Sequence, residues 1–72
     1  MRRLAIIGST GSIGSSALEV VAMFPEEFSV EALAAGDNLE LLRQQIRTFS
    51  PQFVSVRTRE GAMALKEEFQ GL

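Results

Sequence analysis

The chain has 72 residues, of which 46% are hydrophobic, and a formal net charge of −2. A chain of this length makes at most one small domain, and such a domain buries only about 60% of its unfolded surface. It contains no cysteine and no histidine, which excludes a disulfide framework and a zinc site built from those residues. The slight excess of acids argues against a nucleic-acid binder, because such proteins usually carry a basic face.

The N-terminus resembles a targeting segment only superficially. Arg2 and Arg3 precede the apolar residues 4–7, but this run is too short for the hydrophobic region of a signal peptide. No stretch approaches the about 20 apolar residues that a membrane-spanning helix needs. We therefore expect a cytoplasmic protein with neither a membrane nor a nucleic acid as partner.

The first half of the chain predicts a strand, a helix and a second strand. Residues 4–7 are followed by a glycine and are typical of a strand buried on both faces. Apolar residues then recur at helical spacing, and Pro25 lies just past the expected helix end. Residues 28–35 alternate at first and then become apolar, which predicts the second strand. The apolar positions of the helix are Ile13, Ala17, Val20, Val21 and Phe24.

The second half predicts a helix, a short strand and a last helix. Asn38 can cap the first of these helices, and Ser50 ends it because a residue before proline is pushed out of the helical region. Residues 53–56 predict the third strand, and Thr58 can cap the last helix. The expected apolar positions are Leu39, Leu42, Ile46 and Phe49 in the first helix, and Ala62, Leu65 and Phe69 in the last.

The order βαβαβα implies parallel strands, right-handed crossovers and helices that cover the sheet. It corresponds to one half of a Rossmann-like, doubly wound α/β fold. A three-stranded sheet has an open edge and offers only half of a dinucleotide crevice. We therefore expect residues 1–72 to be the N-terminal part of a dinucleotide-binding domain in a longer polypeptide, with Met1 as its natural start.

The junction between the first strand and the first helix reads GSTGSIG, residues 8–14. The first N–H groups of a helix have no intrahelical partner and carry a partial positive charge. A pyrophosphate satisfies both, and glycines let it approach the backbone. The glycines are Gly8, Gly11 and Gly14, the last of which lets the helix pack closely. The hydroxyl groups that can donate to phosphate oxygens are those of Ser9, Thr10 and Ser12.

Other interpretations of this loop are weaker. Its spacing, G-x-x-G-x-x-G, differs from the dinucleotide fingerprint G-x-G-x-x-G, and a glycine-rich turn without a ligand remains an alternative. A Walker loop needs a lysine where Ser15 follows Gly14, and a nucleophile elbow, G-x-S-x-G, is absent. Because the loop follows a strand and opens a helix, we predict a pyrophosphate cradle.

The loop after the second strand contains a candidate for the adenosine end of a dinucleotide. Asp37 follows that strand, where an acid usually binds the ribose 2′-hydroxyl and a basic residue accepts a 2′-phosphate. Taken alone, Asp37 favours a nucleotide without the 2′-phosphate. The alternative is that it is only a loop acid that faces solvent. Asn38 is a helix cap, a ligand contact or both. No residue stands out as a nucleophile or general base, so we assign no catalytic residue and no metal ligand to this chain.

Three stretches, LAIIGSTGSIGSSALEVV, PEEFSVEALAAGDN and FSPQFVSV, together resemble the N-terminus of the 1-deoxy-D-xylulose 5-phosphate reductoisomerase family. The resemblance covers nearly the whole chain. It implies an NADPH-dependent oxidoreductase of the non-mevalonate isoprenoid pathway, which converts 1-deoxy-D-xylulose 5-phosphate to 2-C-methyl-D-erythritol 4-phosphate. It also implies a homodimer and a divalent metal ion (Mg, Mn or Co) that this chain does not itself bind.

By matching position, the resemblance puts residues 10–13 at the pyrophosphate, and Gly36 and Asn38 at the adenosine end. Asp37 departs from the family, whose members often carry a basic or small polar residue beside the 2′-phosphate. Arg57 or Arg59 can compensate for this acid. The predicted cofactor site therefore comprises Gly8, Thr10, Gly11, Ser12, Ile13, Gly14, Gly36, Asp37 and Asn38. The metal ligands and substrate-phosphate residues of the family fall beyond Leu72.

Two alternatives remain open from the sequence. Semialdehyde-type dehydrogenases resemble this chain in opening with a similar strand and glycine loop, and they would need a catalytic cysteine farther along. A stand-alone nucleotide-binding module is the other alternative, and it would act only by binding.

Overall fold

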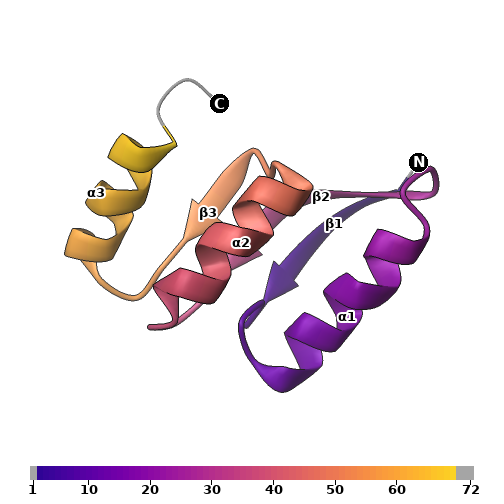
Figure 1. The fold of residues 1–72 in the computed structure, drawn as a ribbon, viewed down its shortest axis with the longest axis horizontal. Helices are drawn as coiled ribbons and strands as arrows, with labels where there is room; N and C mark the ends of the chain where they lie inside the picture. Colours follow the sequence, from indigo (N-terminus) through magenta and orange to yellow (C-terminus); the bar gives the residue numbers. More distant parts are fainter. Residues whose placement is uncertain (1, 70–72) are drawn as a thin grey trace.

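The computed structural model describes residues 2–69 and confirms the predicted order of strands and helices (Figure 1). The expectations about Met1 and about the chain end at 70–72 lie outside the described residues. The strands are β1 (Arg2–Ile7), β2 (Phe28–Ala34) and β3 (Phe53–Ser55). The helices are α1 (Ser12–Met23), α2 (Leu39–Phe49) and α3 (Arg59–Glu68).

The strands form one parallel sheet in the order β1-β2-β3. Ile7 pairs with Ala34, and Ala34 pairs with Ser55, so the three strands end level with one another. The register shifts once, since Leu4 pairs with Val30 while Ala5 pairs with Ala32. The level ends bring the loops that follow β1, β2 and β3 to one edge of the sheet.

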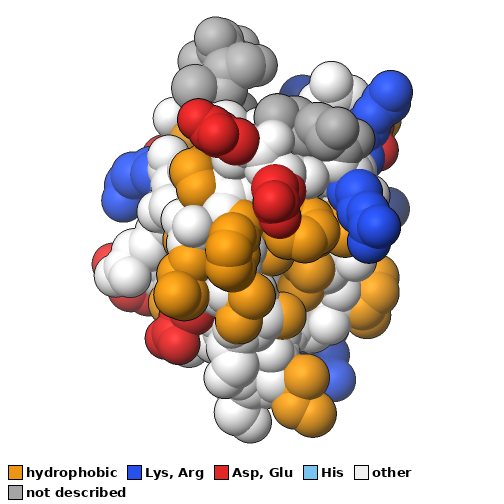
Figure 2. All heavy atoms as spheres, turned by 90° about the vertical axis from the view of Figure 1, so that its right-hand side faces the viewer, with side chains coloured by type: hydrophobic (Ala, Val, Ile, Leu, Met, Phe, Trp, Pro, Cys, Tyr) orange, Lys and Arg blue, Asp and Glu red, His pale blue; other side chains and the backbone are white. Residues whose placement is uncertain are grey.

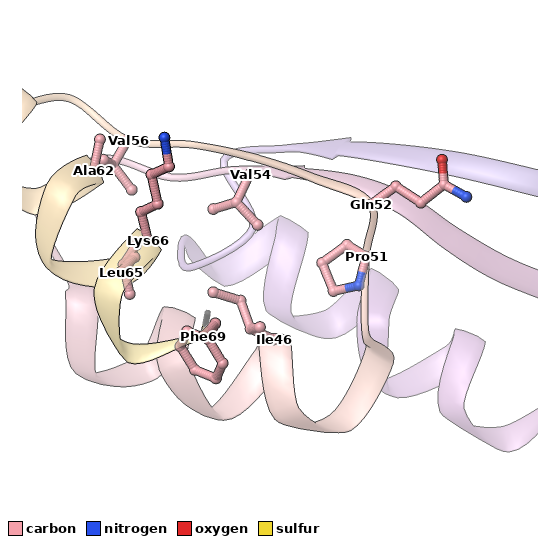
Figure 3. Close-up of a pocket in the computed structure, with 9 residues that line it drawn as sticks. All are labelled: Ile46, Pro51, Gln52, Val54, Val56, Ala62, Leu65, Lys66 and Phe69. Atoms are coloured by element: carbon pink, nitrogen blue, oxygen red, sulfur yellow. The ribbon is translucent and has the colours of Figure 1, made fainter. Parts of the chain in front are cut away.

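All three helices lie on one face of the sheet, as Figure 3 shows with the strands above the helices. Two right-handed crossovers that advance in the same direction, from β1 to β2 and from β2 to β3, put α1 and α2 on the same side. The core lies between this face and the helices, and apolar burial there is the main favourable term for folding. It consists of Leu18, Val21, Val30, Leu33, Leu42, Ile46 and Leu65.

The expectation that β1 is buried on both faces is wrong for this chain. Leu4 and Ile6 pack against the core, whereas Ile7 is 80% exposed. Successive residues of a strand point to opposite faces, and here only one face is covered by helices. Half of the apolar run is therefore left at the surface.

The expected apolar face of α1 is also wrong in part. The buried residues of this helix are Gly14, Leu18 and Val21, whereas Ile13 is 86% exposed and Val20 is exposed as well. Figure 2 faces the side of the molecule where α1 lies and shows hydrophobic side chains gathered there. The helix is apolar on two sides, and the side that carries Gly14 is the one that can approach the sheet closely.

The predicted caps of α2 and α3 are confirmed. The Asn38 side chain accepts a hydrogen bond from the N–H of Leu41 at 3.1 Å, and the Thr58 hydroxyl accepts one from Gly61 at 3.0 Å. At the end of α2, Ser50 adopts the left-handed conformation, with φ of 47°. The expected buried positions hold for Leu42, Ile46 and Leu65, while Ala62 is exposed.

Helix α3 packs beside α2 at the β3 edge of the sheet. Glu68 accepts hydrogen bonds from Arg43 at 2.7 Å and from Arg47 at 3.1 Å, which ties the end of α3 to α2. Between the two helices and β3 lies a hollow toward which Ile46 and Phe69 point (Figure 3). Within residues 2–69, no helix is long and apolar enough to cross a membrane.

Candidate functional site

The loop after β1 is attached to the end of β2. The N–H groups of Gly8 and Ser9 both donate to the carbonyl of Ala34, at 2.7 and 3.0 Å. Gly8 has φ of +70°, a conformation that residues with a Cβ rarely adopt and glycine adopts readily. The Gly8 carbonyl then accepts from the N–H of Gly11 at 3.0 Å, which closes the turn.

Gly14 lets α1 pack directly on this loop. A Cβ at position 14 would lie 2.1 Å from the carbonyl oxygen of Gly8 and 2.8 Å from the Cα of Ser9. A Cβ at Gly11 would meet the same oxygen at 3.4 Å, which is an ordinary contact. The expectation that Gly14 permits close packing is therefore confirmed, with the loop backbone as the surface that it approaches.

The N-terminus of α1 is open to an anion. Its N-cap is Gly11, which supplies no side-chain hydrogen bond, and its first turn holds no acidic residue. Ser12 and Ile13 at the start of the helix are exposed, and a shallow hollow runs past them along Ile7 and Gly8. The first N–H groups of the helix have no intrahelical partner and lie at the positive end of the helix dipole.

The hydroxyl groups of the loop differ in what they can reach. Ser9 is fully buried, so the expectation that its hydroxyl can meet a phosphate is wrong. Ser12 is exposed and Thr10 is half-buried, so both remain accessible. The hydroxyl of Ser15 instead donates to the Gly11 carbonyl at 2.6 Å and supports the helix start.

The loop after β2 lies beside the glycine loop at the same sheet edge. Ala34, which accepts from Gly8 and Ser9, is the last residue of β2, and Gly36 follows two residues later. Gly36, Asp37 and Asn38 are exposed. The structure therefore brings the two predicted parts of the cofactor site to one edge of the sheet.

Asn38 and Asp37 each have a partner within the described chain. The Oδ1 atom of Asn38 caps α2, which leaves its amide N–H groups to donate elsewhere. Asp37 accepts a hydrogen bond from Arg57 at 3.0 Å, and both side chains are about 70% exposed, at 69% and 71%. Of the two arginines that the sequence offered to compensate for Asp37, the structure pairs Arg57 with it.

Gln45, which no motif in the sequence singled out, contacts the glycine loop. This residue of α2 is 7% exposed, and its side-chain Nε2 donates to the Ser9 carbonyl at 2.7 Å. The one available signal was its position between the apolar Leu42 and Ile46 on the buried side of the helix. The neighbouring Gln44 is exposed, so residue type alone could not separate them.

Within residues 2–69, no three acidic side chains come together to form a metal site. The hollow between α2, β3 and α3 lies at the other edge of the sheet from β1, and its lining is mostly apolar, with Lys66 as its charged member (Figure 3). Near the glycine loop, the described chain can meet a charged ligand with backbone N–H groups, hydroxyls, the Asn38 amide and the Asp37–Arg57 pair.

The parallel sheet, the glycine-rich turn from β1 into α1 and the helices of both crossovers define half of a Rossmann-like α/β fold. A family model described as 1-deoxy-D-xylulose 5-phosphate reductoisomerase matches residues 4–72. The chain belongs to this family.

Curated members of the family are similar along almost the whole chain. The reductoisomerase of Geobacter sp. (strain M21) is 58% identical over 71 residues, and so is that of Citrifermentans bemidjiense; both matches cover 99% of the chain. That of Shouchella clausii is 48% identical over 69 residues, or 96% of the chain. The chain spans 18% of the length of each of these relatives.

Proposed function

We propose that residues 1–72 bind NADPH as the N-terminal part of the dinucleotide-binding domain of a 1-deoxy-D-xylulose 5-phosphate reductoisomerase. The observation that carries the proposal is the uncapped, acid-free N-terminus of α1 behind a glycine loop at the carboxyl edge of a parallel sheet. In open α/β sheets ligands bind at this edge. The family membership decides against a semialdehyde-type dehydrogenase.

The residues of this chain fit a pyrophosphate by their chemistry. Ser12 and Ile13, which are exposed at the start of α1, supply backbone N–H donors, and the Ser12 hydroxyl supplies one more. The missing side chain at Gly11 leaves the backbone approachable. The Asn38 amide and the backbone of Gly36 lie where the adenosine end would follow.

NADPH supplies a hydride when it is bound, and the residues described here only hold and orient it. We propose that the complete enzyme converts 1-deoxy-D-xylulose 5-phosphate to 2-C-methyl-D-erythritol 4-phosphate in the cytoplasm. It acts as a homodimer with a divalent metal ion. We assign the catalytic and metal-binding side chains of that enzyme to sequence other than residues 1–72.

A charge placed at the start of α1 tests the proposal. In Ser12→Glu a carboxylate occupies the position of the pyrophosphate, so we expect NADPH to bind roughly tenfold or more weakly, by about 1.4 kcal/mol or more. The same acid is favourable for a helix N-terminus, so the melting temperature should hold or rise. Binding is measured by titrating NADPH fluorescence.

Ser16→Glu is the matched control, because Ser16 is an exposed serine one turn farther along α1. It should leave NADPH affinity within about twofold of the original chain, since the dipole effect fades within the first turn. If Ser12→Glu and the original chain bind NADPH with equal affinity, the N-terminus of α1 is not part of the cofactor site.

A further inference from the structure

The glycine loop is held from the side of α2 by one buried polar side chain. Gln45 donates from Nε2 to the Ser9 carbonyl at 2.7 Å, with both residues buried, Gln45 at 7% and Ser9 at 0% exposure. Ser15 also reaches this carbonyl, but at 3.4 Å, and its hydroxyl has a shorter contact with Gly11 at 2.6 Å. Gln45 is therefore the principal donor to Ser9.

This contact fixes a peptide plane that ends in the candidate site. The carbonyl of Ser9 and the N–H of Thr10 belong to the same planar trans peptide, so they point in opposite directions. When Gln45 holds the carbonyl toward α2, the N–H of Thr10 must point away from α2. The N–H of Ser9 is fixed separately, by Ala34 of β2.

We infer that Gln45 is a positioning residue for the cofactor loop: its amide holds the peptide between Ser9 and Thr10 so that the Thr10 N–H is presented to the pyrophosphate. The inference rests on the proposed function for the identity of the ligand. The contact itself, between α2 and the loop, does not depend on it.

The orientation of the amide follows from its contact. With Nε2 and Oε1 exchanged, two oxygen atoms would face each other at the Ser9 carbonyl. In the structure Oε1 of Gln45 and the hydroxyl of Ser9 are buried without a hydrogen-bond partner among the described residues. Burial of the unpaired Oε1 is unfavourable, while Nε2 of the same side chain holds the loop.

The matched pair Gln45→Met and Gln44→Met tests this inference. Methionine keeps the length of the side chain and removes its donor, and Gln44 is the exposed neighbour on the same helix. On the full chain we expect Gln45→Met to weaken NADPH binding roughly tenfold and Gln44→Met to leave it unchanged. Loss of the orphaned Oε1 offsets the lost contact, so the melting temperature should change little.

Nuclear magnetic resonance reports on the peptide plane without any ligand. In Gln45→Met the amide resonance of Thr10 should shift and exchange with solvent at a different rate, while Gln44→Met should leave it in place. If Gln45 served only to fill the core, methionine would fill it as well, and the Thr10 resonance and the NADPH affinity would both stay where they were. That result would overturn the inference.

The two proposals fail separately. If the original chain does not bind NADPH, the proposed function is at fault, and the Thr10 resonance still decides whether Gln45 holds the loop. If the original chain binds NADPH and Gln45→Met binds it equally well, the positioning role is wrong and the proposed function stands.

Discussion

Gly14 illustrates how a single missing side chain determines the contact between α1 and the loop. The nearest atoms to its hypothetical Cβ belong to the backbone of Gly8 and Ser9, which cannot swing aside as a flexible side chain would. Gly36 is different, because no atom lies within 4 Å of a Cβ there and its φ is not positive. Substitution by alanine should therefore have a large effect on stability at Gly14 and a small one at Gly36.

We expect Gly14→Ala to destabilise the chain by about 2–4 kcal/mol, because relief of the overlap must move α1 or the loop. Gly36→Ala should change stability by less than about 1 kcal/mol in either direction. Urea unfolding followed by circular dichroism measures both. A Gly14→Ala chain as stable as the original would mean that α1 does not sit on the loop as described.

We expect the Asp37–Arg57 pair to influence the choice between NADPH and NADH. Both side chains are largely exposed, and such pairs contribute little to stability, so its removal should leave unfolding almost unchanged. Arg57 follows β3 at the same edge as Asp37, where we expect its guanidinium to meet the 2′-phosphate of NADPH. The acid then holds the arginine in place and does not by itself exclude the phosphate.

We predict that Arg57→Ala reduces the preference for NADPH over NADH roughly tenfold, the effect of losing one charge-assisted hydrogen bond. Arg59→Ala, at the first residue of α3, is the control and should preserve the ratio. Asp37→Lys should raise the preference, since it replaces a negative charge with a positive one. Titration with each nucleotide gives the ratio, and an unchanged ratio in both Arg57→Ala and Asp37→Lys would remove this pair from the site.

At the scale of the helices and strands, the features that the sequence predicts best are those whose signal is local. Asn38 and Thr58 were predicted as caps because a side chain that reaches the N–H three residues ahead needs no distant partner. The buried side of α1 could not be predicted, since this helix carries apolar residues on two sides. Which side is covered depends on where the sheet lies, and that is a property of the whole fold.

The candidate site, too, was predictable from the sequence only where its signal is local. The glycine loop was predictable because GSTGSIG follows a strand and opens a helix. The burial of Ser9 and the role of Gln45 were not, because each depends on a contact between α2 and the loop, 36 residues apart in sequence. The sequence offered Arg57 or Arg59 as a cation that can compensate for Asp37, and the structure pairs Arg57 with it.

The cap of α3 predicts a measurable loss of stability. Thr58→Ala should cost about 1 kcal/mol, because the N–H of Gly61 loses its acceptor at the helix start. For a chain of this size that corresponds to a fall of about 4–8 °C in melting temperature. Thr48→Ala is the control, since the hydroxyl of this exposed threonine donates to the carbonyl of Gln44 within its own helix, and its loss should cost about 0.5 kcal/mol or less.

On the scale of the whole molecule, one face of the sheet is covered by helices and the other is not. Strand β2 is hydrogen-bonded on both sides, whereas β1 and β3 each have one partner strand within the described chain. Apolar side chains such as Ile7, Ile13 and Phe53 remain at the surface. The protection of backbone amides from hydrogen exchange should therefore differ among the three strands of this sheet.

In the 72-residue chain, we expect amide hydrogen exchange to be slowest in β2, at the residues whose N–H groups bond to β1. Exchange in β3 should be roughly tenfold or more faster, because this strand has three residues and, within residues 2–69, pairs only with β2. Hydrogen exchange followed by nuclear magnetic resonance measures the rates residue by residue. Equal protection in all three strands would mean that they open only together, through global unfolding.

The register shift in β2 has a consequence for insertions and deletions. Val30 and Leu33 both face the core although they are three residues apart, because Glu31 stands between the partners of Leu4 and Ala5 as an extra residue. An inserted residue in a central strand ordinarily turns every later side chain to the opposite face. Here the sheet accommodates the extra residue at the register shift itself. A chain without Glu31 would therefore keep each remaining side chain of β2 on its present face.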